Sequence, residues 1–387
     1  MRILVAVERV DRAGGMERYL EILLPALVAR GARVHVLARE LGVLPRGVTG
    51  EQVGWADEHD APGTAARAEV LRALAGFAPE IAVAHNVMDA GIVEALRAAP
   101  RFAYHVHDHR AFCPNGDRVF PRSGRICTLP LGRPCAVHSL TDGCAYGPRR
   151  RTLTLIRRRE RLRDAVAAAD ATIVASRYLA ERASHNEIPA RCVRVIPLPL
   201  PDDAYAERAS VPPPRSIVFA GRIVPQKGLG ALVRAVARIA PKRRPLVRAF
   251  GEGPALEQVR ADATRLGVSL DAPGAAGPEQ IRKAIDGAAL VVLPSLWAEP
   301  FGYVGIEAFA RGRPVVAFDV GGVRAWLEDG ANGIAVPVGD EAALAEALDA
   351  LLHDEQRRAQ LAQRARADAE RFRVAPVTEA LLSAYRG

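Results

Sequence analysis

Residues 289–308 read ALVVLPSLWAEPFGYVGIEA, and this stretch shows how the chain is built. The apolar run Ala289–Leu293 has the length of a buried strand and stops at Pro294. A loop follows, and a helix is predicted from Gly302 to Arg311. A buried strand that passes through a loop into a helix is the repeating unit of a parallel α/β sheet.

The same alternation of apolar runs and helical segments continues through the chain. In the N-terminal half we predict strands at Ile3–Val7, Val34–Leu37, Ile81–Ala84, Phe102–Val106, Ala171–Ala175 and Val193–Ile196. In the C-terminal half we predict further strands at Ser216–Ala220, Leu246–Phe250 and Val315–Phe318. A chain of 387 residues is too long for one hydrophobic core, so the pattern predicts two doubly wound α/β domains.

The proline-rich stretch 201–214 is predicted to link these domains. It separates an N-terminal domain over residues 1–200, which carries an insertion at 109–150, from a C-terminal domain over residues 215–370. A helical tail at 371–387 is predicted to pack back on the N-terminal domain. Ligands of open α/β sheets bind at the carboxyl ends of the strands, so chemistry is expected in the loops that follow them.

Composition excludes several classes of protein. Hydrophobic residues make up 49% and charged residues 25% of the chain, as in an ordinary globular protein. No apolar stretch reaches the roughly 18 residues of a membrane span, and the N-terminus lacks a signal-peptide core, so we expect a cytoplasmic protein. The net charge of +9 favours anionic partners, but aromatic residues are only 5% of the chain, so we expect no nucleic acid.

The first candidate site is the loop Ala13-Gly14-Gly15, which follows the first strand and opens a helix. Gly14 and Gly15 would let the backbone approach a ligand closely, and the positive end of the helix favours an anion. A tight turn that needs positive φ angles would explain the same glycines.

A second candidate is the loop after strand Ser216–Ala220, which carries the cations Arg222 and Lys227. Lys227 is one of only three lysines in the chain. An arginine fork beside a lysine point charge could hold a diphosphate and stabilise it as a leaving group. Two loop cations that simply face solvent are the alternative.

The opening stretch also places two carboxylates, Glu299 in the loop and Glu307 in the helix. The amides from Gly302 to Val304 could receive phosphate oxygens. A carboxylate suits sugar or ribose hydroxyls because it accepts two charge-assisted hydrogen bonds. In the simpler interpretation, Glu307 only stabilises the positive end of its helix.

Together these motifs resemble the retaining glycosyltransferases of family 4. The matching features are Glu299 and Glu307 with seven residues between them, the Glu-Pro-Phe-Gly run, the preceding Leu-Pro-Ser, the Gly221–Gly228 loop, the Gly251–Pro254 turn and the Asp319–Gly322 segment. The resemblance covers essentially the whole chain and is strongest from Ile217 to Val338. It implies the GT-B fold, in which two Rossmann-like domains face each other across a cleft.

The resemblance also implies residue roles. Arg222 and Lys227 would grip the donor diphosphate, Glu307 the ribose and Glu299 a hydroxyl of the transferred sugar. The remaining donor contacts would come from Gly14, Gly15, Phe301, Gly302, Tyr303 and Val304. One departure is Ala325, where the family usually has a glutamate; we interpret it as a lost supporting contact that affects donor positioning and not the reaction.

The run Tyr104–His109 ends a predicted strand and contains three histidines. In the family a His-Asp pair follows this strand and the histidine lies near the donor sugar, so the resemblance gives His107 a catalytic role. His105 and His109 are expected to flank it without a chemical role, and Asp108 to orient the loop. A solvated loop or a metal-binding cluster would explain the same histidines.

Four of the five cysteines lie in the insertion at 109–150, which has little apolar surface to fold around: Cys113, Cys127, Cys135 and Cys144. The Cys-Pro-Asn-Gly run that begins at Cys113 resembles insertions in bacterial members of the family, and its place borders the acceptor side of the cleft. Four thiolates around one structural zinc ion would stabilise such a module. The wide spacings leave reduced thiols and disulfides as alternatives.

The segment Arg149–Arg163 is a candidate basic amphipathic helix. Such a helix can dock on an anionic membrane surface, where lipid-linked acceptors reside. The solvated face of an ordinary helix is the alternative.

The sequence therefore predicts a glycosyltransferase that moves a hexose-type sugar from a nucleotide sugar to an acceptor hydroxyl with retention. A UDP-sugar is the first choice of donor and GDP-mannose the second, and the acceptor is expected to be a cell-surface glycan, a glycolipid or a natural product. No Asp-x-Asp triplet occurs, so no metal cofactor is expected in catalysis. The alternatives are a sugar-nucleotide epimerase of the same fold and a two-domain sugar-binding protein without enzymatic activity.

Overall fold

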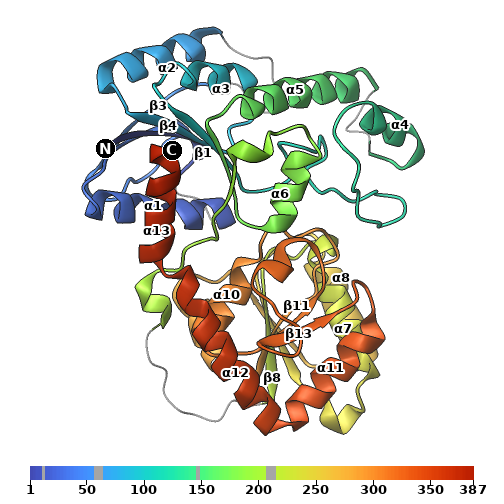
Figure 1. The fold of residues 1–387 in the computed structure, drawn as a ribbon. Coiled ribbons are helices and arrows are strands. Elements are labelled where there is room, and N and C mark those ends of the chain that lie inside the picture. The colour runs from blue at the N-terminus through green and yellow to red at the C-terminus, as the bar shows by residue number, and fades with distance from the viewer. Residues whose placement is uncertain (11–13, 56–63, 145–148, 206–214) are drawn as a thin grey trace. The chain divides into compact units, whose positions relative to one another are not determined.

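The computed structural model describes residues 1–10, 14–55, 64–144, 149–205 and 215–387. These residues form two compact units, and each is described by itself. Unit 1 comprises Met1–Pro199 together with Val374–Gly387, and unit 2 comprises Leu200–Arg373 (Figure 1). Of the predicted linker, residues 206–214 lie outside the described residues, and residues 201–205 belong to unit 2.

Unit 1 is built on a parallel sheet whose described part has seven strands in the order β3-β2-β1-β4-β5-β6-β7. The strands are β1 (Arg2–Arg9), β2 (Arg33–Glu40), β3 (Val48–Gln52), β4 (Ile81–His85), β5 (Phe102–Val106), β6 (Ala171–Val174) and β7 (Val193–Val195). Every residue of β4, β5 and β6 is buried, because helices cover both faces of the sheet there.

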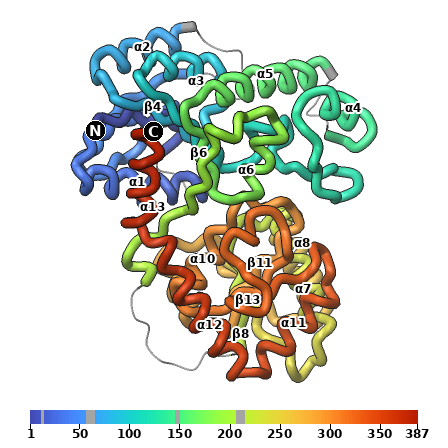
Figure 2. The backbone as a smooth tube through the Cα atoms, in the orientation of Figure 1, coloured from blue at the N-terminus to red at the C-terminus, as the bar shows by residue number. Residues whose placement is uncertain are grey.

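The helices of unit 1 lie on both faces of this sheet. On one face, α2 (Thr64–Phe77), α3 (Ala90–Leu96), α5 (Arg149–Ala167) and α6 (Arg177–Ser184) share one hydrophobic core with alternate residues of the central strands. The other face is covered by α1 (Gly15–Ala29), and the C-terminal helix α13 (Val374–Arg386) packs beside it (Figure 2). Unit 1 therefore contains both N-terminal and C-terminal residues of the sequence. A further helix, α4 (Arg133–Thr141), lies in the insertion and contacts α5.

Unit 2 repeats the same architecture. Its described residues form a six-stranded parallel sheet in the order β10-β9-β8-β11-β12-β13. The strands are β8 (Ser216–Ala220), β9 (Leu246–Phe250), β10 (Leu270–Gly274), β11 (Leu290–Leu293), β12 (Val315–Phe318) and β13 (Gly333–Val336). The helices are α7 (Leu229–Arg238), α8 (Leu256–Leu266), α9 (Pro278–Asp286), α10 (Tyr303–Ala310), α11 (Glu341–His353) and α12 (Glu355–Ala369).

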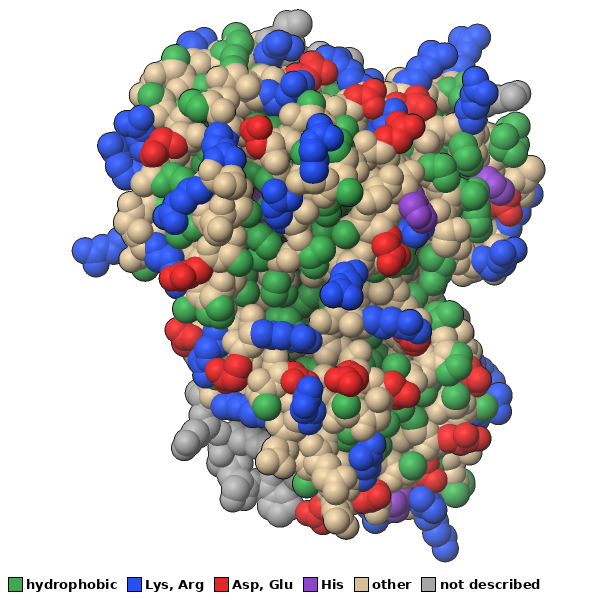
Figure 3. Space-filling model, in the orientation of Figure 1, with side chains coloured by type: hydrophobic (Ala, Val, Ile, Leu, Met, Phe, Trp, Pro, Cys, Tyr) green, Lys and Arg blue, Asp and Glu red, His purple; other side chains and the backbone are tan. Residues whose placement is uncertain are grey.

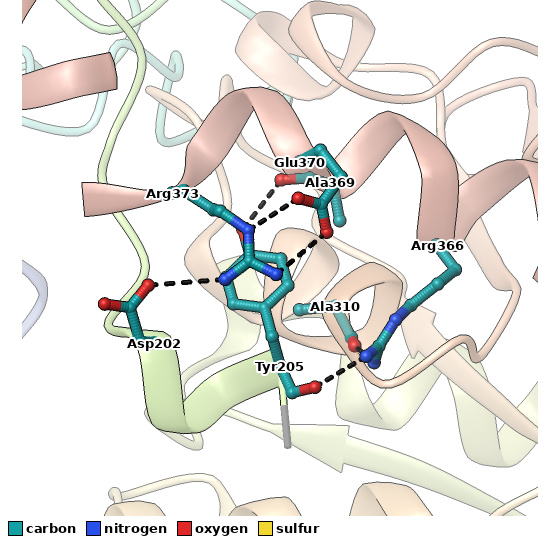
Figure 4. Close-up of polar contacts among 7 residues, drawn as sticks. All are labelled: Asp202, Tyr205, Ala310, Arg366, Ala369, Glu370 and Arg373. Atoms are coloured by element: carbon teal, nitrogen blue, oxygen red, sulfur yellow. Dashed lines mark hydrogen bonds and ion pairs between the residues drawn. The ribbon is translucent and has the colours of Figure 1, made fainter. Parts of the chain in front are cut away.

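The two segments by which the chain enters and leaves unit 2 are fastened to each other. The amide of Leu200 donates to the carbonyl of Phe372 at 2.6 Å. The guanidinium of Arg373 lies 3.9 Å from the ring centre of Tyr205 and pairs with Asp202 at 3.3 Å (Figure 4). The hydroxyl of Tyr205 also donates to the carbonyl of Ala369 at 2.7 Å (Figure 4). These contacts bring both ends of the unit to one place.

Helix α10 packs on Trp326 at a position that only glycine fits. A Cβ on Gly305 would lie 2.2 Å from the Trp326 ring. The ring cannot easily move away, because it is buried and its Nε1 donates to the carbonyl of Phe301 at 2.6 Å. The start of α10 is therefore held at a fixed place in the core of unit 2.

We predict that Gly305→Ala destabilises unit 2 by about 1–3 kcal/mol, the usual cost of overpacking a core. The measurement is urea unfolding followed by tryptophan fluorescence, since Trp297 and Trp326 both lie in this unit. Gly287→Ala is the control, because its Cβ would have no neighbour closer than 3.6 Å. Equal stability of the two variants would contradict the packing described.

Candidate functional site

A lysine and a glutamate meet at the carboxyl edge of the unit 2 sheet. Lys227 ends the short turn Pro225–Lys227 after β8, and Glu299 lies in the loop after the neighbouring strand β11. Nζ of Lys227 donates to Oε1 of Glu299 at 2.5 Å, and Oγ of Ser295 donates to the same oxygen at 2.6 Å. The ammonium also lies 4.9 Å from the ring centre of Trp297. Sequence patterns predicted both charges but not that they pair.

Electrostatics keep this buried carboxyl charged. Only 5% of Glu299 is exposed, and burial alone would raise its pKa. The charge of Lys227 and hydrogen bonds from Lys227, Ser295 and Trp297 outweigh burial, so the pKa of Glu299 lies below its usual range. The site therefore presents a carboxylate at neutral pH.

Two glycines allow the loops to come this close. Gly228 has a φ of +75°, and a Cβ there would lie 1.7 Å from the carbonyl oxygen of Pro294. Gly321 has a φ of +59°, and a Cβ there would lie 2.4 Å from the carbonyl oxygen of Glu299. Both positions need a left-handed backbone and have no room for a side chain. Gly228 lets the lysine loop lie against the end of β11, and Gly321 lets the loop after β12 lie against the carboxylate loop.

The N-terminus of α10 lies just beyond Glu299 in the chain. Gly302 is its N-cap with a φ of +94°, and no side chain caps the helix. Tyr303 and Val304 begin the helix, so their amides belong to the anion-binding end that a helix offers. Phe301 is buried beneath them.

The other two charged residues predicted for unit 2 are Arg222 and Glu307. Arg222 is exposed in the loop after β8 and makes no ion pair within the described part of the chain. Glu307 is half-buried in α10, where its carbonyl accepts a hydrogen bond from the amide of Arg311 at 3.2 Å.

A cluster of three histidines lies in unit 1. β4 and β5 pair so that His85 stands opposite His105, and His107 lies two residues further along, on the same side of the backbone. Nδ1 of His85 and Nε2 of His107 are 3.0 Å apart, and the rings of His85 and His105 stack with centres 4.2 Å apart. The amide of His107 donates to Oδ1 of Asn86 at 3.0 Å. We expected no role for His105 and did not single out His85, although their equivalent places at two strand ends could have shown the pair.

Two tyrosines, from the helices that cover this face of the unit 1 sheet, contact His105. The hydroxyl of Tyr385 in α13 lies 2.8 Å from Nε2 of His105, and the hydroxyl of Tyr19 in α1 lies 3.4 Å from its Nδ1. The C-terminal helix therefore contributes directly to the surroundings of the histidines.

Burial keeps all three histidines neutral. It lowers the pKa of His107 to about 4, an effect that Asp108 opposes and Arg110 reinforces. Burial and the neighbouring imidazoles also lower the pKa of His85 and of His105 well below the usual value.

The histidine cluster has donor atoms that all lie within 4.8 Å of one another. We assign no metal to it, because hydrogen bonds already join His85 to His107 and His105 to Tyr385. His109 lies outside the cluster, with its ring against Tyr178.

The glycines of the first loop lie at the start of α1. Gly14 is its N-cap with a φ of −178°, which is ordinary extended backbone, so the positive-φ explanation fails for this residue. Gly14 and Gly15 are exposed, and the carboxylate of Glu17, in the first turn, lies beside Gly14. Ala13 lies outside the described residues.

Two family models together match most of the chain. Residues 204–368 match the family model described as glycosyl transferases group 1, and residues 13–203 match the model of glycosyltransferase family 4. A D-inositol 3-phosphate glycosyltransferase from Nocardia farcinica is 38% identical over 198 residues, and the alignment covers 48% of this chain and 44% of that protein. The chain thus spans about half the length of the curated relatives it matches.

Solved structures show the same fold over the whole chain. The Anabaena protein HepE in complex with UDP has a TM-score of 0.77 at 21% identity, with 99% of each chain covered. Sucrose-phosphate synthase from Thermosynechococcus elongatus has a TM-score of 0.74 at 20% identity, with 100% of this chain and 98% of that one covered.

The chain has the GT-B fold, and its two halves match models of glycosyltransferase families. More narrowly, the chain belongs to glycosyltransferase family 4. Among the helices that the structure describes, none has the length and apolar character needed to cross a membrane.

We predict that unit 1 loses stability as pH falls from about 6.5 toward 4. Its histidines have folded pKa values below the unfolded value near 6.5, so the unfolded chain binds more protons in this range, and the stabilisation is complete above it. His107→Asn should reduce the pH slope of the unfolding free energy by up to about 1.4 kcal/mol per pH unit. Urea unfolding at pH 7, 6 and 5 measures this slope. His35→Asn, which removes a histidine beside Glu51 at the sheet edge, should leave it in place; an equal effect of both variants would disprove the assignment.

Proposed function

We propose that this glycosyltransferase moves a hexose from a nucleotide sugar to an acceptor hydroxyl with retention of configuration, with UDP-sugars as first and GDP-mannose as second donor. The Lys227–Glu299 pair carries this proposal. It places a cation and a charged acceptor of hydrogen bonds 2.5 Å apart at the carboxyl edge of the sheet, beside the uncapped start of α10. A donor carries an anionic diphosphate and a hydroxyl-bearing sugar next to each other, which matches this arrangement. The UDP complexes of HepE support the choice of nucleotide.

When the donor binds, Lys227 and Glu299 each replace the other with a group of the donor. The diphosphate takes the ammonium of Lys227, with Arg222 and the amides of Gly302 to Val304 as further positive groups. Glu299 then loses its cation while staying buried, and a sugar hydroxyl that donates to it restores a partner. Ser295 remains bound to the carboxylate throughout. Diphosphate and sugar are thus recognised together, and a sugar without the matching hydroxyl leaves a buried charge unsatisfied.

Glu307 and the glycine loop would complete the donor site. Glu307 is proposed to accept from the ribose hydroxyls of the nucleotide. The start of α1, with Gly14 and Gly15, is proposed to receive the donor phosphates from unit 1. The role of the glycines rests on the family resemblance together with their position at the start of α1, whereas that of Glu307, which lies beyond the first turn of α10, rests on the resemblance alone.

The hydrogen bonds of the histidine cluster define what His107 offers a ligand. Nε2 of His85 is buried without a partner among the described residues, so it is best left unprotonated, and the proton lies on Nδ1. His85 then donates to Nε2 of His107, and the proton of neutral His107 lies on Nδ1. We propose that this N–H donates to an oxygen of the transferred sugar.

The reaction needs no protein nucleophile in this proposal. The acceptor hydroxyl attacks the anomeric carbon on the face from which the diphosphate leaves, and its proton passes to the leaving phosphate oxygen. Lys227, Arg222 and the start of α10 stabilise the charge that develops on that oxygen. No divalent ion is required, because these groups neutralise the diphosphate.

The acceptor is proposed to be a hydroxyl of a cell-surface glycan, a glycolipid or a natural product. Relatives named D-inositol 3-phosphate glycosyltransferases make inositol phosphates the first candidates to screen. Formation of a new glycoside would exclude the two alternative functions, which are epimerisation of the donor and sugar binding without turnover.

Contact with an anionic membrane through Arg149–Arg163 would bring a lipid-linked acceptor to the enzyme. Helix α5 has fewer available cations than its sequence suggests, because Arg159 is buried and Arg161 pairs with Glu94 at 2.6 Å. On the face drawn in Figure 3, cationic side chains are interspersed with anionic ones. The exposed residues Arg150, Arg151 and Arg157 remain for such a contact.

We predict that Lys227→Ala lowers turnover of a UDP-sugar by about 30- to 1000-fold, the effect of losing one electrostatic stabiliser of the leaving group. Lys242→Ala is the matched control, because this lysine of the same unit is exposed. Product formation is followed by mass spectrometry with EDTA present, and the anomeric configuration by NMR.

The double variant Lys227→Ala/Glu299→Gln separates catalysis from structure. Lys227→Ala alone leaves a buried carboxylate without its cation, so it should also destabilise unit 2. Removing the carboxylate charge should restore stability but not turnover. Recovery of turnover together with stability would show that Lys227 acts only structurally, and an inverted product would disprove retention.

A further inference from the structure

The four cysteines of the insertion, although spread over 32 residues, come together. Cys113 follows β5, Cys127 lies after a tight turn, Cys135 is in α4 and Cys144 follows α4. All four line one cavity of about 30 Å³. That space suits an ion or one or two waters and is too small for a sugar or nucleotide. Cys192, the fifth cysteine, does not line it.

The chemistry of these thiols points to a cation. All are free, with no disulfide between them. Four cysteines that line one small cavity form the kind of ligand set that soft divalent metals such as zinc prefer.

The loop that follows Cys113 is tightly curled. The amide of Gly116 donates to the carbonyl of Cys113 at 3.0 Å. Gly116 and Arg118 both have positive φ angles, of 78° and 51°, and this curls the loop around the sulfur. A left-handed arginine is uncommon and shows that the surrounding contacts impose the conformation.

A buried guanidinium stands beside this cluster. Arg118 is 2% exposed and donates to the carbonyls of Cys127 at 3.0 Å, Leu129 at 2.8 Å and Phe112 at 3.4 Å. Within the described residues it forms no ion pair with a carboxylate. Burying a positive charge with only carbonyl partners is costly, and a nearby negative centre would relieve that cost.

We propose that Cys113, Cys127, Cys135 and Cys144 hold one zinc ion, which is the structural centre of the insertion. Four thiolates and one Zn²⁺ carry a net charge of −2, which Arg118 partly balances. Binding releases four protons, because each ligand enters as a thiol and leaves its proton to solvent. Zinc favours four sulfur ligands in a tetrahedral site, and a site with four protein ligands has no open position for catalysis.

Binding would contract the cavity. Among the described residues, only the histidine cluster has three or more ligand atoms that all lie within 4.8 Å of one another, so the cysteines surround a wider space. The ion would draw each sulfur to about 2.3 Å from its centre. His138 also lines the cavity, but its Nδ1 pairs with Asp142 at 2.6 Å, so we assign it no place among the ligands.

The test is the zinc content of the full-length chain, purified under reducing conditions from zinc-replete medium and measured by elemental analysis. We expect about one equivalent. Serine variants of Cys113, Cys127, Cys135 and Cys144 should each lose most of it, whereas Cys192→Ser and His138→Asn should keep it.

A second measurement on the unaltered chain holds even if the serine variants fail to fold. Mercurial titration should release the zinc after about four thiols have reacted, and cobalt substitution should give the absorption of a tetrahedral tetrathiolate site. Zinc-free protein with five reactive thiols would overturn the proposal, as would a mass lower by about 4 Da from two disulfides. Retention of zinc by Cys144→Ser together with loss in His138→Asn would overturn the assigned ligand set.

Discussion

The buried carboxylate of Glu299 is the constraint on which the site of unit 2 depends. A charge that is 5% exposed needs a cation close by, and Lys227 supplies it only because the loops after β8 and β11 touch. That contact in turn requires glycine at position 228, since a side chain there would meet the backbone of Pro294, and glycine at position 321 lets the loop after β12 lie against the backbone of Glu299. The buried ion pair at the sheet edge thus also constrains residues that are not part of the pair. The same pairing makes the site responsive, because a donor that takes the lysine must also satisfy the glutamate.

In unit 1, by contrast, the three histidines of the cluster are neutral. Three imidazoles in contact would repel one another if protonated, and burial between a sheet and two helices keeps them neutral. One of these helices, α13, comes from the end of the chain, and its Tyr385 binds His105. The surroundings of the histidine cluster therefore include a segment that follows unit 2 in the sequence.

The sequence revealed the strands that are buried on both faces and missed three of the four edge strands, β7 being the one it predicted. β4, β5, β11 and β12 read as apolar runs because helices cover both of their faces. The strands β3, β10 and β13, which the sequence did not predict, lie at sheet edges and are largely exposed or half-buried, so no such run marks them. In the candidate site, motifs located Lys227, Glu299 and His107. Their partners His85 and Tyr385 escaped notice because strand register and the return of α13 bring them there, and neither leaves a local pattern.

The insertion shows why charge balance has to be considered for each buried group. Lys227 and Glu299 balance each other, and the histidines avoid the problem by staying neutral, but Arg118 cannot lose its proton and finds only carbonyls. Four neutral thiols next to it do not supply the missing negative charge, whereas four thiolates around a divalent ion do. The same ion would supply what the segment lacks in apolar surface, since α4 has no buried residue. The proposed metal centre would therefore account for both the buried arginine and the folding of α4, which has no buried residue.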